Sequence, residues 1–337
     1  MSPVVDRLPV SLSNEFFYLT LRDGGLQIPN LYEIVGIAKI KIHKSIKLSN
    51  DTVLKLLIES QNAYIQERYL QALGLGGIQP STDINEHKLT IKRERRVAFR
   101  RKIHGVGHEI FSSCPMTNKW LNGTFKGMNA RTYIRGIKLR TNSLETKVTC
   151  TRGMEVNKTC RLCNNAEESL MHILQICECT RGTRYTRHHK LRYAVAQKLR
   201  HKGYEVYEEQ TYYPNENNLK CCRPDIIAIK NNKAYILDVT YVYEISGASF
   251  IRAYQDRKQR YEPIETAVMS RYNCKEIQTH GLTVGSRGSF FYGHLNIWRQ
   301  LGFTNGELTT IAINGLQDSI KICSILRKTK DIKNSIK

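Results

Sequence analysis

The chain has 337 residues, and its 52 lysines and arginines outnumber its 30 acidic residues, which gives a formal net charge of +22. With 41% hydrophobic residues, it has enough apolar material for a folded core. The charge indicates a polyanionic partner, either nucleic acid or an anionic membrane surface, and we favour nucleic acid. No apolar run approaches the roughly 20 residues of a spanning helix and the first residues do not form a signal peptide, so we expect neither an integral membrane protein nor a secreted one.

The N-terminal region is predicted to be helical and basic. Residues 36–75 have apolar side chains near helical spacing, and residues 92–102 hold seven basic residues and one acid. Such runs are often solvated helix faces, but the density of arginine favours a surface that contacts phosphates. The arginines that we expect to make these contacts are Arg95, Arg96, Arg100 and Arg101.

A second basic helix is predicted over residues 181–202. Leu191, Val195 and Leu199 form an apolar stripe at a spacing of four, and eight lysines and arginines surround it. The residues of this segment that we expect to bind nucleic acid are Arg184, Arg187 and His188.

Four cysteine and histidine residues between these regions have the spacing of a zinc site. They are Cys160, Cys163, His172 and Cys177. A pair of cysteines two residues apart can share one metal across a tight turn, and four protein ligands close the coordination, which is typical of a structural zinc ion. Cys179 is an alternative fourth ligand in place of Cys177.

A β-hairpin with two aspartates follows. Two runs rich in β-branched residues flank Asn231-Asn232, and asparagine tolerates the positive φ that both positions of a type I′ turn require. Pairing the strands about this turn places Asp225 opposite Asp238, with Cβ atoms about 4.5–5.5 Å apart. Two carboxylates at that separation repel each other, so we expect a divalent cation, Mg²⁺, between them.

A magnesium ion held by two carboxylates is typical of phosphate chemistry, in which it polarises a phosphoryl oxygen and activates water. Of the basic residues in a helix predicted over residues 247–262, we choose Lys258 to assist. Glu208 or Glu209 is a further candidate carboxylate. Another strand is predicted near residues 276–284.

Together these motifs resemble a known family. The order of a Cys-Cys-His-Cys knuckle, Arg187-His188-His189 and then Arg-Pro-Asp225 with Asp238 is similar to the C-terminal part of site-specific non-LTR retrotransposon proteins with a restriction-like endonuclease. Segments 22–29, 137–146, 285–288 and 301–303 resemble other motifs of that family, so the resemblance covers nearly the whole chain.

The resemblance implies an α/β fold in which a PD-(D/E)xK nuclease core, of αβββαβ type, follows a basic helical region and a small zinc knuckle. It implies four segments: residues 1–130 (the end of the reverse-transcriptase or thumb-like region and a basic linker), 131–180 (linker and knuckle), 181–290 (endonuclease) and 291–337 (C-terminal helices). The implied function is Mg²⁺-dependent nicking of target DNA in the nucleus, whose new 3′ end primes reverse transcription. DNA, the element RNA and a polymerase module encoded upstream are the implied partners.

Three features depart from the family. The lysine that we choose, Lys258, lies in a predicted helix and not in the strand, as is usual for this branch of the superfamily. No Tyr-x-Asp-Asp motif is present, so we expect that this chain is not itself a reverse transcriptase, and His189 stands where the family usually has an acid or an amide. Two other interpretations therefore stay open. One is a non-catalytic zinc-knuckle protein that binds nucleic acid, and the other is an inactive, truncated copy of an element.

Overall fold

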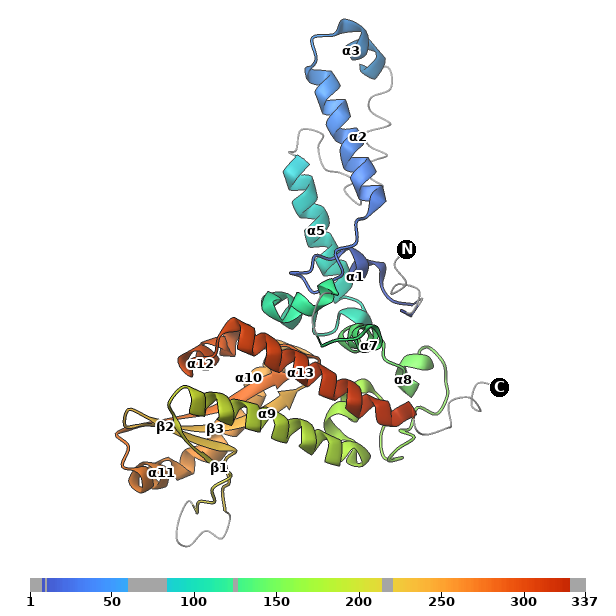
Figure 1. Cartoon of the computed structure of the whole chain (residues 1–337). Helices are drawn as coiled ribbons and strands as arrows, with labels where there is room; N and C mark the ends of the chain where they lie inside the picture. Colours follow the sequence, from blue (N-terminus) through green and yellow to red (C-terminus); the bar gives the residue numbers. More distant parts are fainter. Residues whose placement is uncertain (1–7, 10, 60–83, 124–126, 214–220, 328–337) are drawn as a thin grey trace.

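The N-terminal part of the protein is helical. The computed structural model describes residues 8–9, 11–59, 84–123, 127–213 and 221–327. The first helices are α1 (Asn14–Tyr18), α2 (Leu31–Leu48), α3 (Thr52–Glu59) and α5 (Ile84–Arg100). In Figure 1, α2 and α3 project away from the body of the molecule. The helices predicted over residues 36–75 are confirmed as far as Glu59, and the rest of that range lies outside the described residues.

Local side chains fix where α2 and α3 begin. The side chain of Asn30 accepts hydrogen bonds from the first backbone N–H groups of α2. Asp51 Oδ1 accepts from the backbone of Val53 at 2.9 Å and of Leu54 at 3.2 Å. These are N-caps, which satisfy the N–H groups that a helix leaves unpaired in its first turn.

Short helices connect this region to the rest of the chain. They are η2 (Ile103–Gly105), α6 (His108–Ser113), η3 (Pro115–Asn122), α7 (Ala130–Arg140), α8 (Lys147–Cys150), η4 (His172–Ile176) and η5 (Glu178–Thr180). Trp120 in η3 and Ile137 in α7 are fully buried in one apolar core, which also contains residues of the zinc-ligand region.

The C-terminal half contains the predicted αβββαβ order. Helix α9 (Arg181–His201) precedes β1 (Glu205–Glu208), β2 (Ile226–Lys230) and β3 (Lys233–Val242). Then come α10 (Gly247–Tyr261), η6 (Glu262–Ile264), α11 (Glu265–Tyr272) and β4 (Glu276–Gly285). The strands form one sheet in the order β1-β2-β3-β4, in which the first two pairs are antiparallel and β3 and β4 are parallel. The fold is therefore α/β with a mixed four-stranded sheet.

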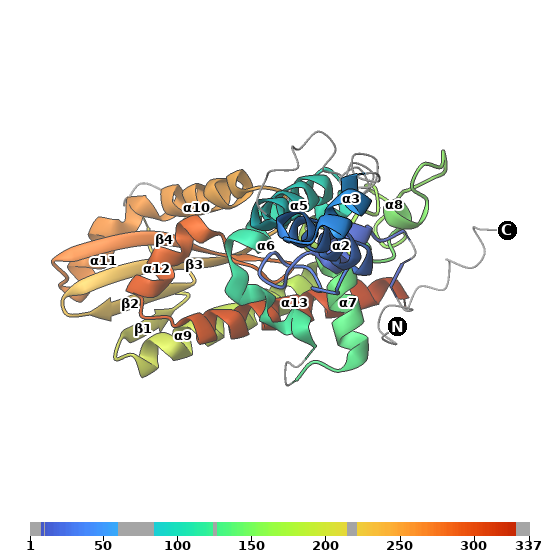
Figure 2. The ribbon, with the colours of Figure 1, turned by 90° about the horizontal axis from the view of Figure 1, so that it is seen from above.

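Helices cover both faces of this sheet. Figure 2 shows α10 and α11 on one side of the strands and α9 and α13 on the other. On the α9 side, Leu191, Val195 and Leu199 pack with sheet residues such as Leu237 and Val239, so the predicted apolar stripe is confirmed. Side chains alternate between the two faces along β3, so Ile236 points to the other face, where Tyr261 and α11 pack.

The C-terminal helices join the two halves. After η7 (Tyr292–His294) and α12 (Leu295–Gln300), the long helix α13 (Asn305–Ser324) precedes η8 (Ile325–Arg327). Leu308 and Ala312 belong to the core on the sheet, whereas Leu316 and Ile320, further along the same helix, belong to the core of the N-terminal half. Helix α13 therefore packs against both cores.

Two buried arginines add a polar connection. Arg140 Nε donates to the backbone oxygen of Arg287 at 3.0 Å, and Arg140 Nη1 donates to Asn118 Oδ1 at 2.8 Å. Arg287 Nε lies 3.3 Å from Glu244 Oε2, with both side chains completely buried. These contacts tie α7 and η3 to the ends of β3 and β4. Among the described residues, no helix is long and apolar enough to cross a membrane.

Candidate metal centre and cleft

The predicted hairpin and its register are confirmed. Asn231 and Asn232 have φ values of 53° and 58°, as a type I′ turn requires. The ladder pairs Ile226 with Leu237, and Asp225 and Asp238 are the next residues outward on the two strands. Asp225 lies just before β2, where its Oδ2 accepts a hydrogen bond from the backbone N–H of Val239 at 2.8 Å.

The two aspartates are buried and anchored by different neighbours. Asp225 is 7% exposed and Asp238 is 4% exposed. His188 Nε2, from α9, lies 3.0 Å from Asp225 Oδ1. Tyr261 Oη, from α10, donates to Asp238 Oδ1 at 2.9 Å. Helices from both faces of the sheet therefore hold the carboxylate pair in place.

The electrostatics of Asp238 reflect this placement. Burial, and then the nearby charge of Asp225, raise the pKa of Asp238 to about 6, while Arg257 opposes the shift. Asp238 Oδ2 is buried and accepts no hydrogen bond from the described residues, and Arg257 Nη1 lies 3.0 Å away as an ion-pair partner. A buried oxygen without a hydrogen bond beside a second carboxylate is a donor set that fits a hard divalent cation such as Mg²⁺.

A cleft of about 530 Å³ opens over the pair. Asp225 and Asp238 are the acidic residues of its lining. The arginines of the lining are Arg181, Arg184, Arg187, Arg223, Arg257 and Arg260. A cleft with two carboxylates surrounded by arginines suits a polyanion that meets a bound cation.

Arg257, and not the predicted Lys258, lies next to the carboxylates. Lys258 Nζ is 3.5 Å from Glu262, and both side chains are nearly half exposed and outside the cleft lining. Successive residues of a helix point about 100° apart, so Arg257 and Tyr261, four residues apart, share the face toward Asp238 and Lys258 does not. The predicted role of Lys258 is not supported by this arrangement.

The two candidate glutamates are held by other partners. Glu208 lies within 3.3 Å of Arg192 and 2.8 Å of Arg200. Glu209 pairs with Arg192 and, at 3.0 Å, with Arg223. Neither glutamate belongs to the cleft lining, so no third carboxylate of the described residues lies at the pair.

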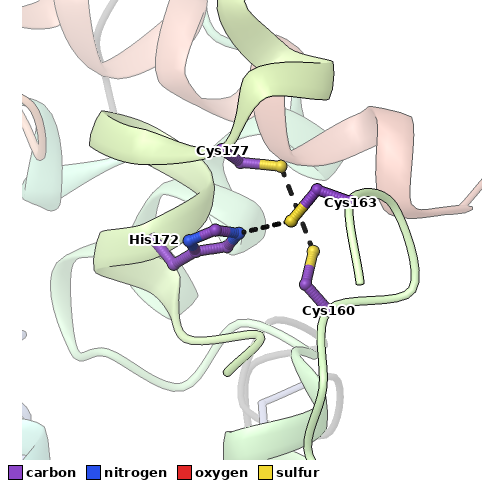
Figure 3. Close-up of side chains that lie close together, drawn as sticks. All are labelled: Cys160, Cys163, His172 and Cys177. Atoms are coloured by element: carbon purple, nitrogen blue, oxygen red, sulfur yellow. Dashed lines mark hydrogen bonds between the residues drawn. The ribbon is translucent and has the colours of Figure 1, made fainter. Parts of the chain in front are cut away.

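The four predicted zinc ligands form one cluster (Figure 3). Their ligand atoms all lie within 4.8 Å of one another. Cys160 Sγ and Cys177 Sγ are 4.0 Å apart, and Cys163 Sγ and His172 Nε2 are 3.3 Å apart. Bond lengths of 2.0–2.3 Å to a tetrahedral zinc ion put ligand atoms roughly 3.5–3.8 Å apart, so the cluster fits zinc.

The structure resolves the alternative between Cys177 and Cys179. Cys179 is exposed, and its Sγ contacts the backbone oxygen of Leu162 at 3.1 Å instead of joining the cluster. Burial raises the pKa of Cys177 to about 12, with the Cys160 thiol as the next cause. Because zinc binds the thiolate, the metal would provide the charge that keeps this buried sulfur ionised.

Two of the predicted nucleic-acid-binding arginines hold the knuckle against α9 instead. Arg187 is 3% exposed, donates to the backbone oxygen of Leu174 at 3.0 Å and to Ser319 Oγ at 2.7 Å, and stacks on Tyr241. Arg184 donates to the backbone oxygen of Cys177 at 3.0 Å. This corrects the prediction for Arg187, because a buried side chain with these partners has a structural role.

Predicted nucleic-acid-binding arginines of α5 also make contacts within the protein. Arg95 pairs with Glu33 and donates to the backbone oxygen of Tyr18 at 3.0 Å. Arg96 Nε lies 2.9 Å from the buried Asp23. Arg100 contacts the His108 ring at 3.3 Å. The structure therefore assigns structural contacts to Arg95 and Arg96.

Arg101 is the member of the predicted set that is exposed and has no partner among the described residues.

Sequence reasoning also missed Tyr261, which contacts Asp238. The signal that could have found it is its spacing of four residues from Arg257.

Comparisons with known proteins identify relatives that match most of this chain. The Pol polyprotein of the type-2 retrotransposable element R2DM of Drosophila melanogaster is 25% identical over 290 residues, which is 83% of this chain and 26% of that protein. A Pol polyprotein of the type-1 retrotransposable element R2 of Popillia japonica is 24% identical over 83% of this chain and 56% of that protein. One from Nasonia vitripennis is 27% identical over 76% of this chain and 23% of that protein.

No family model matches the chain. The chain spans between about a quarter and just over half the length of these relatives. Several R2 polyproteins nevertheless match more than four fifths of it, including both halves joined by α13. The resemblance predicted from the motifs is thereby confirmed, and the chain is homologous to the Pol polyproteins of R2 retrotransposable elements.

Proposed function

We propose that this chain is the Mg²⁺-dependent DNA endonuclease part of a retrotransposon polyprotein, with a restriction-like nuclease core of the PD-(D/E)xK type. The observation that carries the proposal is the buried pair Asp225 and Asp238 at the floor of a cleft lined by arginines. The order of strands and helices, with β3 parallel to β4 and antiparallel to β2, supports it.

Each residue of the site has a separate role in the proposed reaction. Asp225 and Asp238 would hold Mg²⁺, which would supply Lewis-acid chemistry at the scissile phosphate and an activated water. The backbone N–H of Val239 and the hydroxyl of Tyr261 orient the two carboxylates. Arg257 supplies positive charge for the phosphate as negative charge develops in the transition state.

The exposed arginines of the cleft, Arg181, Arg223 and Arg260, bind the DNA backbone, which gives affinity without reading sequence. The zinc knuckle is structural: it is bonded to α9, the helix that also carries His188 to Asp225. In the element, nicking would supply the 3′ end for reverse transcription by a polymerase module, with the element RNA as template, in the nucleus.

A supercoiled plasmid tests the proposal, since one nick relaxes it. We expect relaxed circles with Mg²⁺ or Mn²⁺ and none in buffer without a divalent ion. Plasmids that carry segments of genomic DNA and added element RNA are further arms, because a specific target can be required. Relaxation that does not depend on a divalent ion would contradict the proposal.

One observation favours a second candidate, a non-catalytic protein that binds nucleic acid. The ion pair of Arg257 with Asp238 partly neutralises the carboxylates in the absence of metal. If the plasmid is bound with high affinity but stays supercoiled in every arm, with Mn²⁺ failing to bind the protein, this second function is the correct one.

A further inference from the structure

Three planar side chains follow one another along the exposed side of α9. Arg181, Tyr185 and His189 are spaced four residues apart, so they lie above one another on one face of the helix. The Arg181 guanidinium lies 5.4 Å from the centre of the Tyr185 ring, and its Nη2 donates to Tyr185 Oη at 3.1 Å. The rings of Tyr185 and His189 are 6.4 Å apart and inclined by only 32°.

These side chains are not part of a core. Tyr185 is 50% exposed, and Arg181 and His189 are exposed as well. A large aromatic ring in such a position has contact area available for a ligand. The planar groups are also held by one another, so little conformational entropy remains to be lost when they bind.

This row of side chains lies close to the carboxylate pair. Arg181 and Tyr185 line the same cleft as Asp225 and Asp238. His188, which directly precedes His189 and contacts its ring edge to face, reaches Asp225 at 3.0 Å. A nucleotide resting on the row would therefore lie beside the phosphate that meets the carboxylates.

We propose that Arg181, Tyr185 and His189 form a stacking platform for an unpaired base of the DNA strand in the cleft. This inference rests on the proposed nuclease function and names its substrate class, DNA with unpaired bases at or next to the cut. Bases of single-stranded nucleic acid stack on aromatic rings and on arginine planes without regard to sequence. Unpaired bases suit the platform because they need not be pulled out of a duplex, which costs energy.

The alternative is that this face only follows the phosphates of a duplex, through Arg181. In that case the Tyr185 ring would add nothing to binding, and paired and unpaired DNA would be equivalent. A fluorescent base separates the two cases, because 2-aminopurine is quenched when an aromatic ring stacks on it. Tyr193, also on α9 and 60% exposed but outside the cleft lining, provides a matched control.

The experiment measures 2-aminopurine fluorescence and binding affinity for a duplex with a short unpaired bubble and for the same duplex fully paired. No divalent ion is added, so binding is measured whether or not the protein cleaves DNA. We expect the wild type to quench the probe in the bubble and to bind the bubble more tightly than the duplex. Tyr185→Ala should lose the quenching and weaken bubble binding on the order of tenfold.

Tyr185→Phe should keep the quenching, because stacking needs the ring and not the hydroxyl, and Tyr193→Ala should behave as the wild type. Equal quenching and affinity in Tyr185→Ala and wild type would overturn the proposal, and so would an equal loss in Tyr193→Ala. Tighter binding of an RNA of the same sequence would overturn the assignment to DNA. Failure of the plasmid test with the stacking result intact would refute the nuclease function alone.

Discussion

The guanidinium of Arg257 lies 3.0 Å from the buried Oδ2 of Asp238, whereas Lys258, the next residue of α10, pairs with Glu262 on the helix surface. The positive charge closest to the carboxylate pair thus comes from arginine. Arginine keeps its charge at any pH of interest and can donate two hydrogen bonds to one phosphate. This relationship decides which basic residue the proposed chemistry should need.

Replacing Arg257 should therefore impair nicking more than replacing Lys258. Arg257→Ala removes charge at the site where the transition state becomes negative, so we expect about a hundredfold slower relaxation of plasmid. Lys258→Ala should change the rate by less than about threefold, because its side chain is outside the cleft. Unchanged melting temperatures would show that both variants fold. A severe loss in Lys258→Ala with a mild one in Arg257→Ala would restore the sequence-based assignment.

Metal binding should stabilise the protein in a manner that depends on pH. Burial and the charge of Asp225 raise the pKa of Asp238 to about 6, so the metal-free protein loses stability as the pH rises from about 4 to about 6. Above that range Asp238 is ionised, so the pair can bind a cation. Mn²⁺ at ten times its dissociation constant should then raise the melting temperature by roughly 2–5 °C at pH 7.5 and much less at pH 5. An equal shift at both values would contradict the assignment.

The same titration should appear in the reaction. Because Asp238 must lose its proton to hold a metal, the nicking rate at limiting Mg²⁺ should fall as the pH drops below about 6. High Mg²⁺ should move this fall to lower pH, since metal and proton compete for one carboxylate. A rate profile that is unaffected by the metal concentration would place the titrating group elsewhere.

The zinc knuckle offers a prediction with an internal control. Cys163→Ser removes a ligand from the cluster, so the purified variant should contain less than the single zinc ion expected per wild-type chain and should melt at a lower temperature. Cys179→Ser, only two residues beyond the ligand Cys177, should retain both the zinc and the melting temperature. Elemental analysis after gel filtration measures the metal. Loss of zinc in Cys179→Ser would reverse the choice of ligand.

The basic run of α5 should divide into structural and DNA-binding positions. Arg95→Ala breaks a half-buried ion pair with Glu33, so it should lower the melting temperature and leave the salt dependence of DNA binding nearly unchanged. Arg101→Ala should keep the melting temperature and reduce the slope of log K against log salt by about one. Titrations at three salt concentrations measure the slope. An unchanged slope in Arg101→Ala would show that the exposed Arg101 side chain does not contact DNA phosphates.

Much of the candidate site could be predicted because it depends on local pattern. The Asn231-Asn232 turn determines the hairpin register, and the register alone determines that Asp225 and Asp238 are opposed. The cysteine spacing likewise predicts a cluster whose members lie within one short segment. In both cases a few adjacent residues carry the information.

The side-chain contacts that the sequence did not predict depend on distant partners. Arg95 pairs with Glu33, which is 62 residues away in the sequence, and Arg187 donates to Ser319, which is 132 residues away. No local sequence pattern reveals such contacts. One signal for Arg187 was present in the sequence. It lies four residues before Leu191, in line with the apolar stripe through Val195 and Leu199, so its side chain had to point inward.

The most direct test of the central claim, that Asp225 and Asp238 together hold the ion that cleaves DNA, is the nicking rate of Asp238→Ala with Mg²⁺. The control is Asp256→Ala, which removes an exposed carboxylate from the same α10 that carries Arg257. The account predicts that Asp238→Ala leaves supercoiled plasmid intact while still binding DNA, and that Asp256→Ala nicks it at the wild-type rate. Robust nicking by Asp238→Ala would place the active site elsewhere and leave the hairpin as ordinary structure.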